Sequence, residues 1–141
     1  MRTYWIAAML VVAACDKGGD KSAAGSGNKA TEGAEDTGAR KDLVEAWKKG
    51  GLAVSDLAPE KVAFGTDCRK GTVGAVEVLV CQYGSADEAK KQVDAGNTWI
   101  AENMFAGSSQ AHGPLLIVAA DRQKSDPSGK TIQKMMSLAP K

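Results

Sequence analysis

The chain has 141 residues, enough for one compact domain and little else. Its 18 Lys and Arg residues nearly balance its 17 Asp and Glu residues, and the formal charge of +1 argues against a nucleic-acid-binding protein, which needs a clear basic excess. A single histidine excludes a His-rich metal site.

The first 14 residues have the pattern of a secretory signal peptide. One cation, Arg2, precedes an apolar run from Tyr4 to Ala14. A membrane-spanning helix needs about 20 apolar residues, so this run is too short to cross a bilayer. Its length is that of the apolar region of a signal peptide. We therefore expect residues 1–14 to direct export and to be removed.

The residues around the predicted cleavage point carry a family resemblance. The segment Val12-Ala13-Ala14-Cys15 resembles the lipobox of bacterial lipoproteins. That resemblance implies diacylglycerol on Cys15, cleavage just before it, and anchoring in the lipid bilayer of the bacterial cell envelope. The alternative is an ordinary signal peptide cut after Ala14. Asp16 resembles the inner-membrane retention signal of enteric lipoproteins, but that rule differs between bacterial groups, so either membrane remains open.

A tether is expected to follow the anchor. Between Asp16 and Arg40 there is no Leu, Ile, Val, Met, Phe, Tyr or Trp. Such a segment cannot bury enough apolar surface to offset the entropy cost of ordering its backbone. We therefore divide the chain into a signal peptide (1–14), an acylated Cys15 with a flexible tether (15–40), and a single folded domain (41–141).

The first half of the domain predicts a helix and then a hairpin. Apolar residues in 43–47 have helical spacing, and Gly50-Gly51 is a plausible stop. Residues 52–60 read as a loop that ends at Pro59. The segment 62–83 is rich in β-branched residues and alternates in its second half, as a strand with one buried face does.

The second half repeats the helix and hairpin. Ser85 and Glu88 form a capping box that predicts the start of a second helix. Residues 115–120 are a buried-strand run, preceded by His112-Gly113 in a tight turn. Asp126-Pro127 predicts the start of a third helix, with proline in its first turn.

The resulting order is α-ββ-α-ββ-α. It predicts an α+β fold with a four-stranded antiparallel sheet and helices on one face, a two-layer sandwich.

The two remaining cysteines are predicted to form a disulfide. Exported proteins favour bridged over free cysteines, and a two-residue turn at Gly74-Ala75 would place Cys68 opposite Cys81. In that register the pair is non-hydrogen-bonded, with Cα atoms about 4.5 Å apart, which permits a disulfide. The same register pairs Val73 with Val76, Thr72 with Glu77, and Lys70 with Leu79.

Catalytic chemistry is weakly supported. His112 is the one imidazole, and its place beside Gly113 favours a role in the turn, because histidine tolerates positive φ. Ser108 and Ser109 lie near it without the glycine pattern of a nucleophile elbow. The carboxylates are scattered singly, and nothing in the sequence predicts a cofactor or a metal.

The interaction surface is expected on the sheet face away from the helices. The hairpin register places Lys70, Thr72, Glu77 and Leu79 there, together with the disulfide. We therefore interpret the protein as a lipoprotein with a small non-enzymatic domain that binds an envelope protein or peptide. The alternative is a small envelope hydrolase using His112, which would need a hydrogen-bonded partner in a concave pocket.

Overall fold

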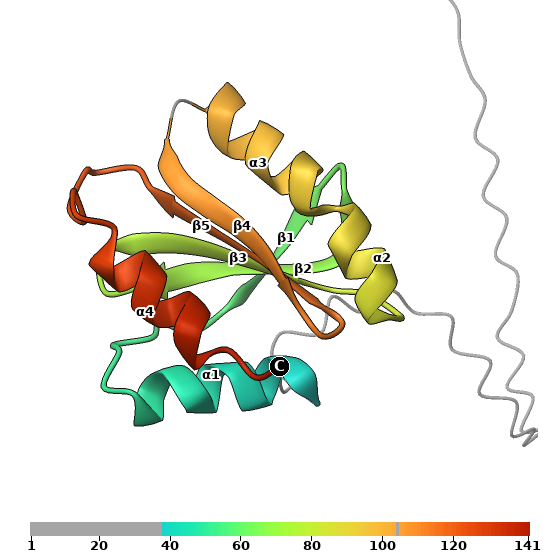
Figure 1. The fold of residues 1–141 in the computed structure, drawn as a ribbon, viewed down its shortest axis with the longest axis horizontal. Helices are drawn as coiled ribbons and strands as arrows, with labels where there is room; N and C mark the ends of the chain where they lie inside the picture. Colours follow the sequence, from blue (N-terminus) through green and yellow to red (C-terminus); the bar gives the residue numbers. More distant parts are fainter. Residues whose placement is uncertain (1–37, 104) are drawn as a thin grey trace, which may run out of the picture. The chain divides into compact units, whose positions relative to one another are not determined.

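The computed structural model describes residues 38–103 and 105–141 (Figure 1). The predicted signal peptide, Cys15 and residues 16–37 of the predicted tether lie outside the described residues. The helices are α1 (Ala39–Lys49), α2 (Ala86–Lys91), α3 (Val93–Glu102) and α4 (Lys130–Leu138). The strands are β1 (Ala58–Val62), β2 (Gly65–Val73), β3 (Val76–Gln82), β4 (Ala106–His112) and β5 (Leu115–Asp121). Among the described residues no helix is long and apolar enough to cross a bilayer.

The fold is α+β, as predicted, with an antiparallel sheet of five strands in the order β1-β2-β3-β5-β4. The prediction of four strands is wrong, because residues 58–62, expected to be mostly loop, form β1. Pro59 lies in this strand and lowers its strand propensity, but β1 is at the sheet edge, where a missing N–H is tolerated. The helices α2 and α3 follow one another directly around Gln92 and form one helical arm.

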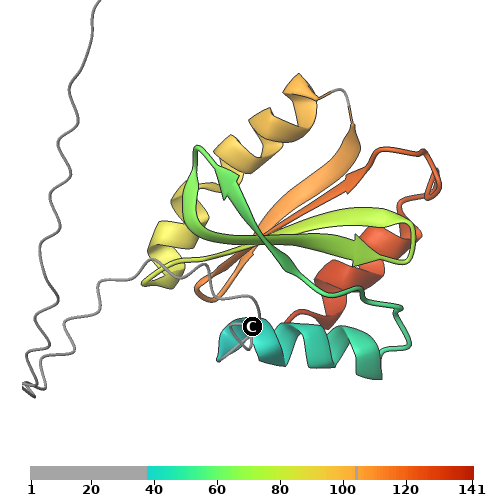
Figure 2. The ribbon, with the colours of Figure 1, turned by 180° about the vertical axis from the view of Figure 1, so that it is seen from behind.

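Helices cover both faces of the sheet, so the predicted two-layer arrangement is also wrong (Figures 1 and 2). Val78 and Val80 of β3 pack in one core with Leu43 of α1 and Met135 of α4. Leu79, between those two valines in sequence, packs in a second core with residues of α3. Strand β5 is buried along its whole length, as a strand covered on both faces must be.

The predicted hairpin register is confirmed. Strands β2 and β3 pair Val73 with Val76, and Cys68 with Cys81. Gly74 has a φ of 61°, the left-handed conformation that a primed two-residue turn requires. The Cys68–Cys81 disulfide is present, with Cα atoms 3.9 Å apart.

The α1 helix is fixed to α4 through its buried tryptophan. Trp47 is completely buried, and its Nε1–H donates to the Met135 carbonyl oxygen at 2.8 Å. Helix α1 begins at Ala39, ahead of the domain boundary predicted at Lys41. Arg40 is buried as well, and its Nη2 lies 3.1 Å from Asp67 Oδ2 on β2.

Side-chain hydrogen bonds to backbone amides support the starts of α2 and α4. Ser85 Oγ accepts from the Glu88 amide, which confirms the predicted start of the second helix. The third predicted helix starts later than expected, at Lys130. Asp126 still caps it, because its Oδ2 accepts from the Thr131 amide at 2.8 Å and the Ile132 amide at 3.1 Å.

Candidate binding groove

A groove of about 660 Å³ lies between the β1–β2 hairpin and α3, and we call it the α3 groove. Figure 2 shows the two elements side by side. Its apolar lining comes from the hairpin, the sheet and the helix, through Val62, Phe64, Leu79, Ala95 and Trp99. A volume of this size, with an apolar lining and a few polar groups, is typical of ligand sites.

The sheet supplies the floor of the groove. Lys70 of β2 and Leu79 of β3 are directly paired across the hairpin, and both line the cavity. Leu79 is almost fully buried, whereas the Lys70 side chain keeps 33% of its surface exposed. An apolar group entering the groove would therefore meet Leu79 at its base and a lysine ammonium beside it.

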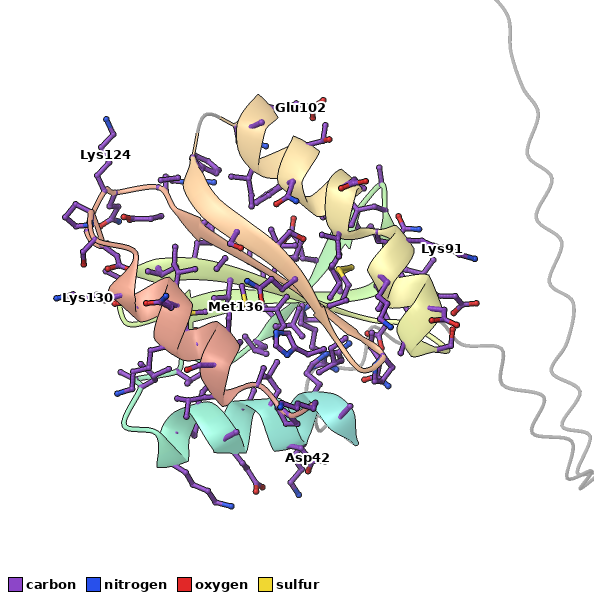
Figure 3. The ribbon with its side chains drawn as sticks, in the orientation of Figure 1. Asp42, Lys91, Glu102, Lys124, Lys130 and Met136 are labelled. Atoms are coloured by element: carbon purple, nitrogen blue, oxygen red, sulfur yellow. A yellow bond between two sulfur atoms is a disulfide. The ribbon has the colours of Figure 1, made fainter. Side chains whose placement is uncertain are left out.

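Helix α3 forms one side of the groove. Ala95, Trp99 and Glu102 recur at helical spacing and line it from the helix (Glu102 is labelled in Figure 3). The Trp99 ring meets the Phe105 ring edge to face, with centroids 6.0 Å apart. Arg122 lies over that phenylalanine, its guanidinium carbon 4.7 Å from the ring centre. The contact with Phe105, which in turn contacts Arg122, therefore fixes the Trp99 ring at this side of the groove.

The hairpin tip forms the opposite side. Val62 and Phe64 line the groove from the turn between β1 and β2. The Tyr83 hydroxyl donates to the Phe64 carbonyl oxygen at 2.6 Å, which ties this turn to the end of β3. Burial raises the pKa of Tyr83 above its usual value, so the hydroxyl stays protonated and able to donate.

Charged groups near the groove pair with each other. Lys70 Nζ lies 3.0 Å from Glu77 Oε1, and Arg122 Nη2 lies 3.5 Å from the same oxygen. Along the groove lining, Glu60 and Glu102 balance the cations Lys61 and Lys70. The groove has no net charge by this count, so it does not select strongly for charged ligands.

The four residues of the predicted interaction face separate into three settings. Lys70 and Leu79 line the α3 groove, Glu77 pairs with Lys70 and Arg122, and Thr72 is exposed. The expectation of an open sheet face is wrong where α3 covers it. The groove residues from 62–64 and from α3 were not predicted. A hint was available in the apolar run Val62-Ala63-Phe64, which is unexpected on an exposed turn unless something packs against it.

His112 is not part of the α3 groove. It ends β4 opposite Leu115, and the left-handed residue of the turn is Gly113, with a φ of 54°. The expectation that His112 itself takes positive φ is therefore wrong. Its Nε2 is buried with no hydrogen-bond partner, and burial lowers the pKa of His112 below its usual value.

The serines near His112 do not form a nucleophilic pair with it. Ser109 and His112 are an odd number of residues apart on β4, so their side chains leave the strand on opposite faces. Ser108 shares the face of His112 but lies about 13 Å along the strand. His112 does not line the α3 groove. A hydrolase using His112 stays a prediction.

In the described part of the chain, no group of three or more His, Cys, Asp or Glu side chains is placed to hold a metal ion. Comparison of the chain with protein-family models, curated proteins and solved structures gives no match.

Proposed function

We propose that this protein is a lipid-anchored binding module of the bacterial cell envelope, held by acylated Cys15 and using the α3 groove to bind a segment of an envelope protein or peptide. The observation that carries the binding role is the groove itself, about 660 Å³ with Leu79 as its base. The lipobox-like segment ending at Cys15 supports the anchor. Several acyl chains would give stable attachment where a single chain gives marginal attachment.

The lining supports a peptide segment as the occupant. The sides carry aromatic and aliphatic groups, Phe64 and Trp99 among them, that suit an apolar side chain. The lining as a whole carries equal numbers of carboxylates and ammonium groups, which suit the polar backbone of a peptide better than a compact anion or cation. We therefore expect a partner that inserts one or two apolar side chains.

A blocking substitution tests this proposal. Ala95 lines the groove and is half-buried, so Ala95→Arg places a long side chain across it. Ala101 is exposed on the same helix and does not line the groove, so Ala101→Arg adds the same charge elsewhere. Tagged wild-type protein and both variants are incubated with envelope extract, and the captured proteins are compared by mass spectrometry.

We expect a species captured by the wild type and by Ala101→Arg to be lost, by about tenfold or more, with Ala95→Arg. A tenfold loss corresponds to about 1.4 kcal/mol of binding free energy, a modest requirement for blocking a buried anchor side chain. Capture that is equal for all three proteins, or lost equally in both variants, would contradict binding through the groove.

A further inference from the structure

We infer that the α3 groove forms only while the Cys68–Cys81 disulfide is intact, so that reduction of the disulfide and loss of the binding site are one event. The inference rests on the proposed function in taking the groove as the binding site. It concerns the hairpin tip, residues 62–65, which is both a side of the groove and the cover of the two sulfur atoms.

The tip lies directly on the disulfide. A Cβ built on Gly65 would overlap Cys68 Sγ and lie 3.1 Å from both Cys81 Sγ and the Tyr83 hydroxyl oxygen. Only glycine allows the backbone to approach the sulfurs this closely. Cys68 is 3% exposed and Cys81 is not exposed at all. A reductant therefore has no path to the sulfur atoms until the tip lifts.

Apart from its packing around the disulfide, the tip has limited backbone support. Strand β1 is an edge strand and pairs only with β2. Its register shifts between Glu60 and Val62, which interrupts the ladder next to the turn. Val62 and Phe64 pack against the core that contains Cys68 and Cys81, and the Tyr83 hydroxyl donates a hydrogen bond to the Phe64 carbonyl oxygen. Lifting the tip breaks that bond and removes Val62 and Phe64 from the groove.

The chemistry is thiol–disulfide exchange with an external dithiol. One thiolate of the dithiol attacks a cysteine sulfur and breaks the Cys68–Cys81 bond, forming a mixed disulfide. The second thiolate of the dithiol then releases the remaining cysteine and closes the reagent into its own disulfide. Two electrons pass to the protein, and the two protons lost by the dithiol match those gained by Cys68 and Cys81.

Binding and reduction are then linked in both directions. An occupant of the groove holds the tip down and slows reduction, and reduction frees the tip and weakens binding. The disulfide thereby restricts a working site to protein that has reached an oxidising compartment.

The rate of reduction tests the inference without any ligand. Purified oxidised protein is mixed with excess dithiothreitol and alkylated at intervals, and the alkylated fraction of Cys68 and Cys81 is measured by peptide mass spectrometry. Tyr83→Phe removes the bond that holds the tip and should speed reduction about fivefold, the ratio that corresponds to one ordinary hydrogen bond. Ser55→Ala is the matched control, because Ser55 Oγ accepts from the Thr72 amide at 2.8 Å, towards the opposite end of β2.

We expect Tyr83→Phe to be reduced faster and Ser55→Ala to match the wild type, because only local opening of the tip is required. Equal acceleration in both variants would show that reduction waits for global unfolding, and no acceleration in Tyr83→Phe would show that the tip is not the barrier. Either result overturns the inference.

Hydrogen exchange of the reduced wild type is the second readout. Backbone amides in 61–65 should lose protection while those of β5 keep it. Unchanged protection in 61–65 would overturn the inference, and so would loss of protection throughout the chain. Neither result depends on a partner, so a failure here is distinguishable from a failure of the capture experiment.

Discussion

Two aspartates organise the connection between β5 and α4. Asp121 is buried at the end of β5, and its carboxylate accepts from the Ser125 amide at 2.9 Å and the Asp126 amide at 2.8 Å. Asp126 in turn caps α4. The backbone hydrogen bond from Asp126 is the main reason that the pKa of Asp121 lies below its usual value.

The lowered pKa makes this loop sensitive to acid. Asp121 is ionised in both the folded and the unfolded protein above about pH 5, where its hydrogen bonds contribute fully to stability. As the pH falls through the lowered pKa, the folded protein takes up the proton and that contribution disappears. We expect Asp121→Asn to lower the thermal midpoint at pH 7, and the difference from the wild type to shrink towards pH 3.

Thermal unfolding followed by circular dichroism at pH 7, 5 and 3 checks this prediction. Asp87→Asn is the control, because the Asp87 side chain is 86% exposed. A difference between wild type and Asp121→Asn that stays constant from pH 7 to pH 3 would contradict it.

At the scale of elements, α3 packs against β4 unusually closely through a glycine. Gly96 is buried in the middle of α3, and a Cβ there would overlap Ser109 Oγ and lie 3.0 Å from Val118 Cγ2. Ser109 Oγ is itself buried without a hydrogen-bond partner. The close approach also lets Asn97 Oδ1 accept from the Ser109 amide at 3.2 Å, which occupies a backbone donor on this edge strand.

We expect Gly96→Ala to destabilise the protein by about 1–3 kcal/mol through overpacking. The sign of this stability change tests the close contact, because alanine in an unhindered helix interior would stabilise the protein by up to about 1 kcal/mol relative to glycine. In a Ser109→Ala background the same substitution should cost about 1 kcal/mol less, since the overlapping oxygen is gone. Urea unfolding of the four proteins in this double-mutant cycle gives the coupling, and purely additive costs would contradict the contact.

The elements also show what the sequence could and could not predict. The β2–β3 register was predictable because the turn rule at Gly74 and the pairing of two cysteines agree on one register. Strand β1 was not predicted, because Pro59, Glu60 and Lys61 are poor strand formers. The strand forms through its pairing with β2. Only the unbroken apolar run in β5 indicated that both faces of the sheet are covered.

The groove could not be predicted, because the segments that line it lie far apart in the sequence. Its sides come from 62–64 and from α3, about thirty residues apart, and its floor is a cross-strand pair whose burial depends on α3. Each segment alone reads as an ordinary turn, strand or helix. Only their packing around Leu79 makes a concave surface.

At the scale of the whole molecule, the folded domain and the proposed anchor at Cys15 belong to one chain. Residues between Glu60 and Glu102 line the groove, and Cys15 is proposed to hold the chain at the bilayer. The proposed anchor and the proposed groove binding together predict that the partner is bound at a membrane.

The most direct test is photo-crosslinking of the full-length protein in bacterial cells, with the crosslinking amino acid at Ala95 or, as control, at Ala101. Adducts are then measured in membrane and soluble fractions. We predict an adduct at Ala95 only, in the membrane fraction, that moves to the soluble fraction in a Cys15→Ser background. No adduct at Ala95, equal adducts at both positions, or an unchanged distribution in Cys15→Ser would contradict the account.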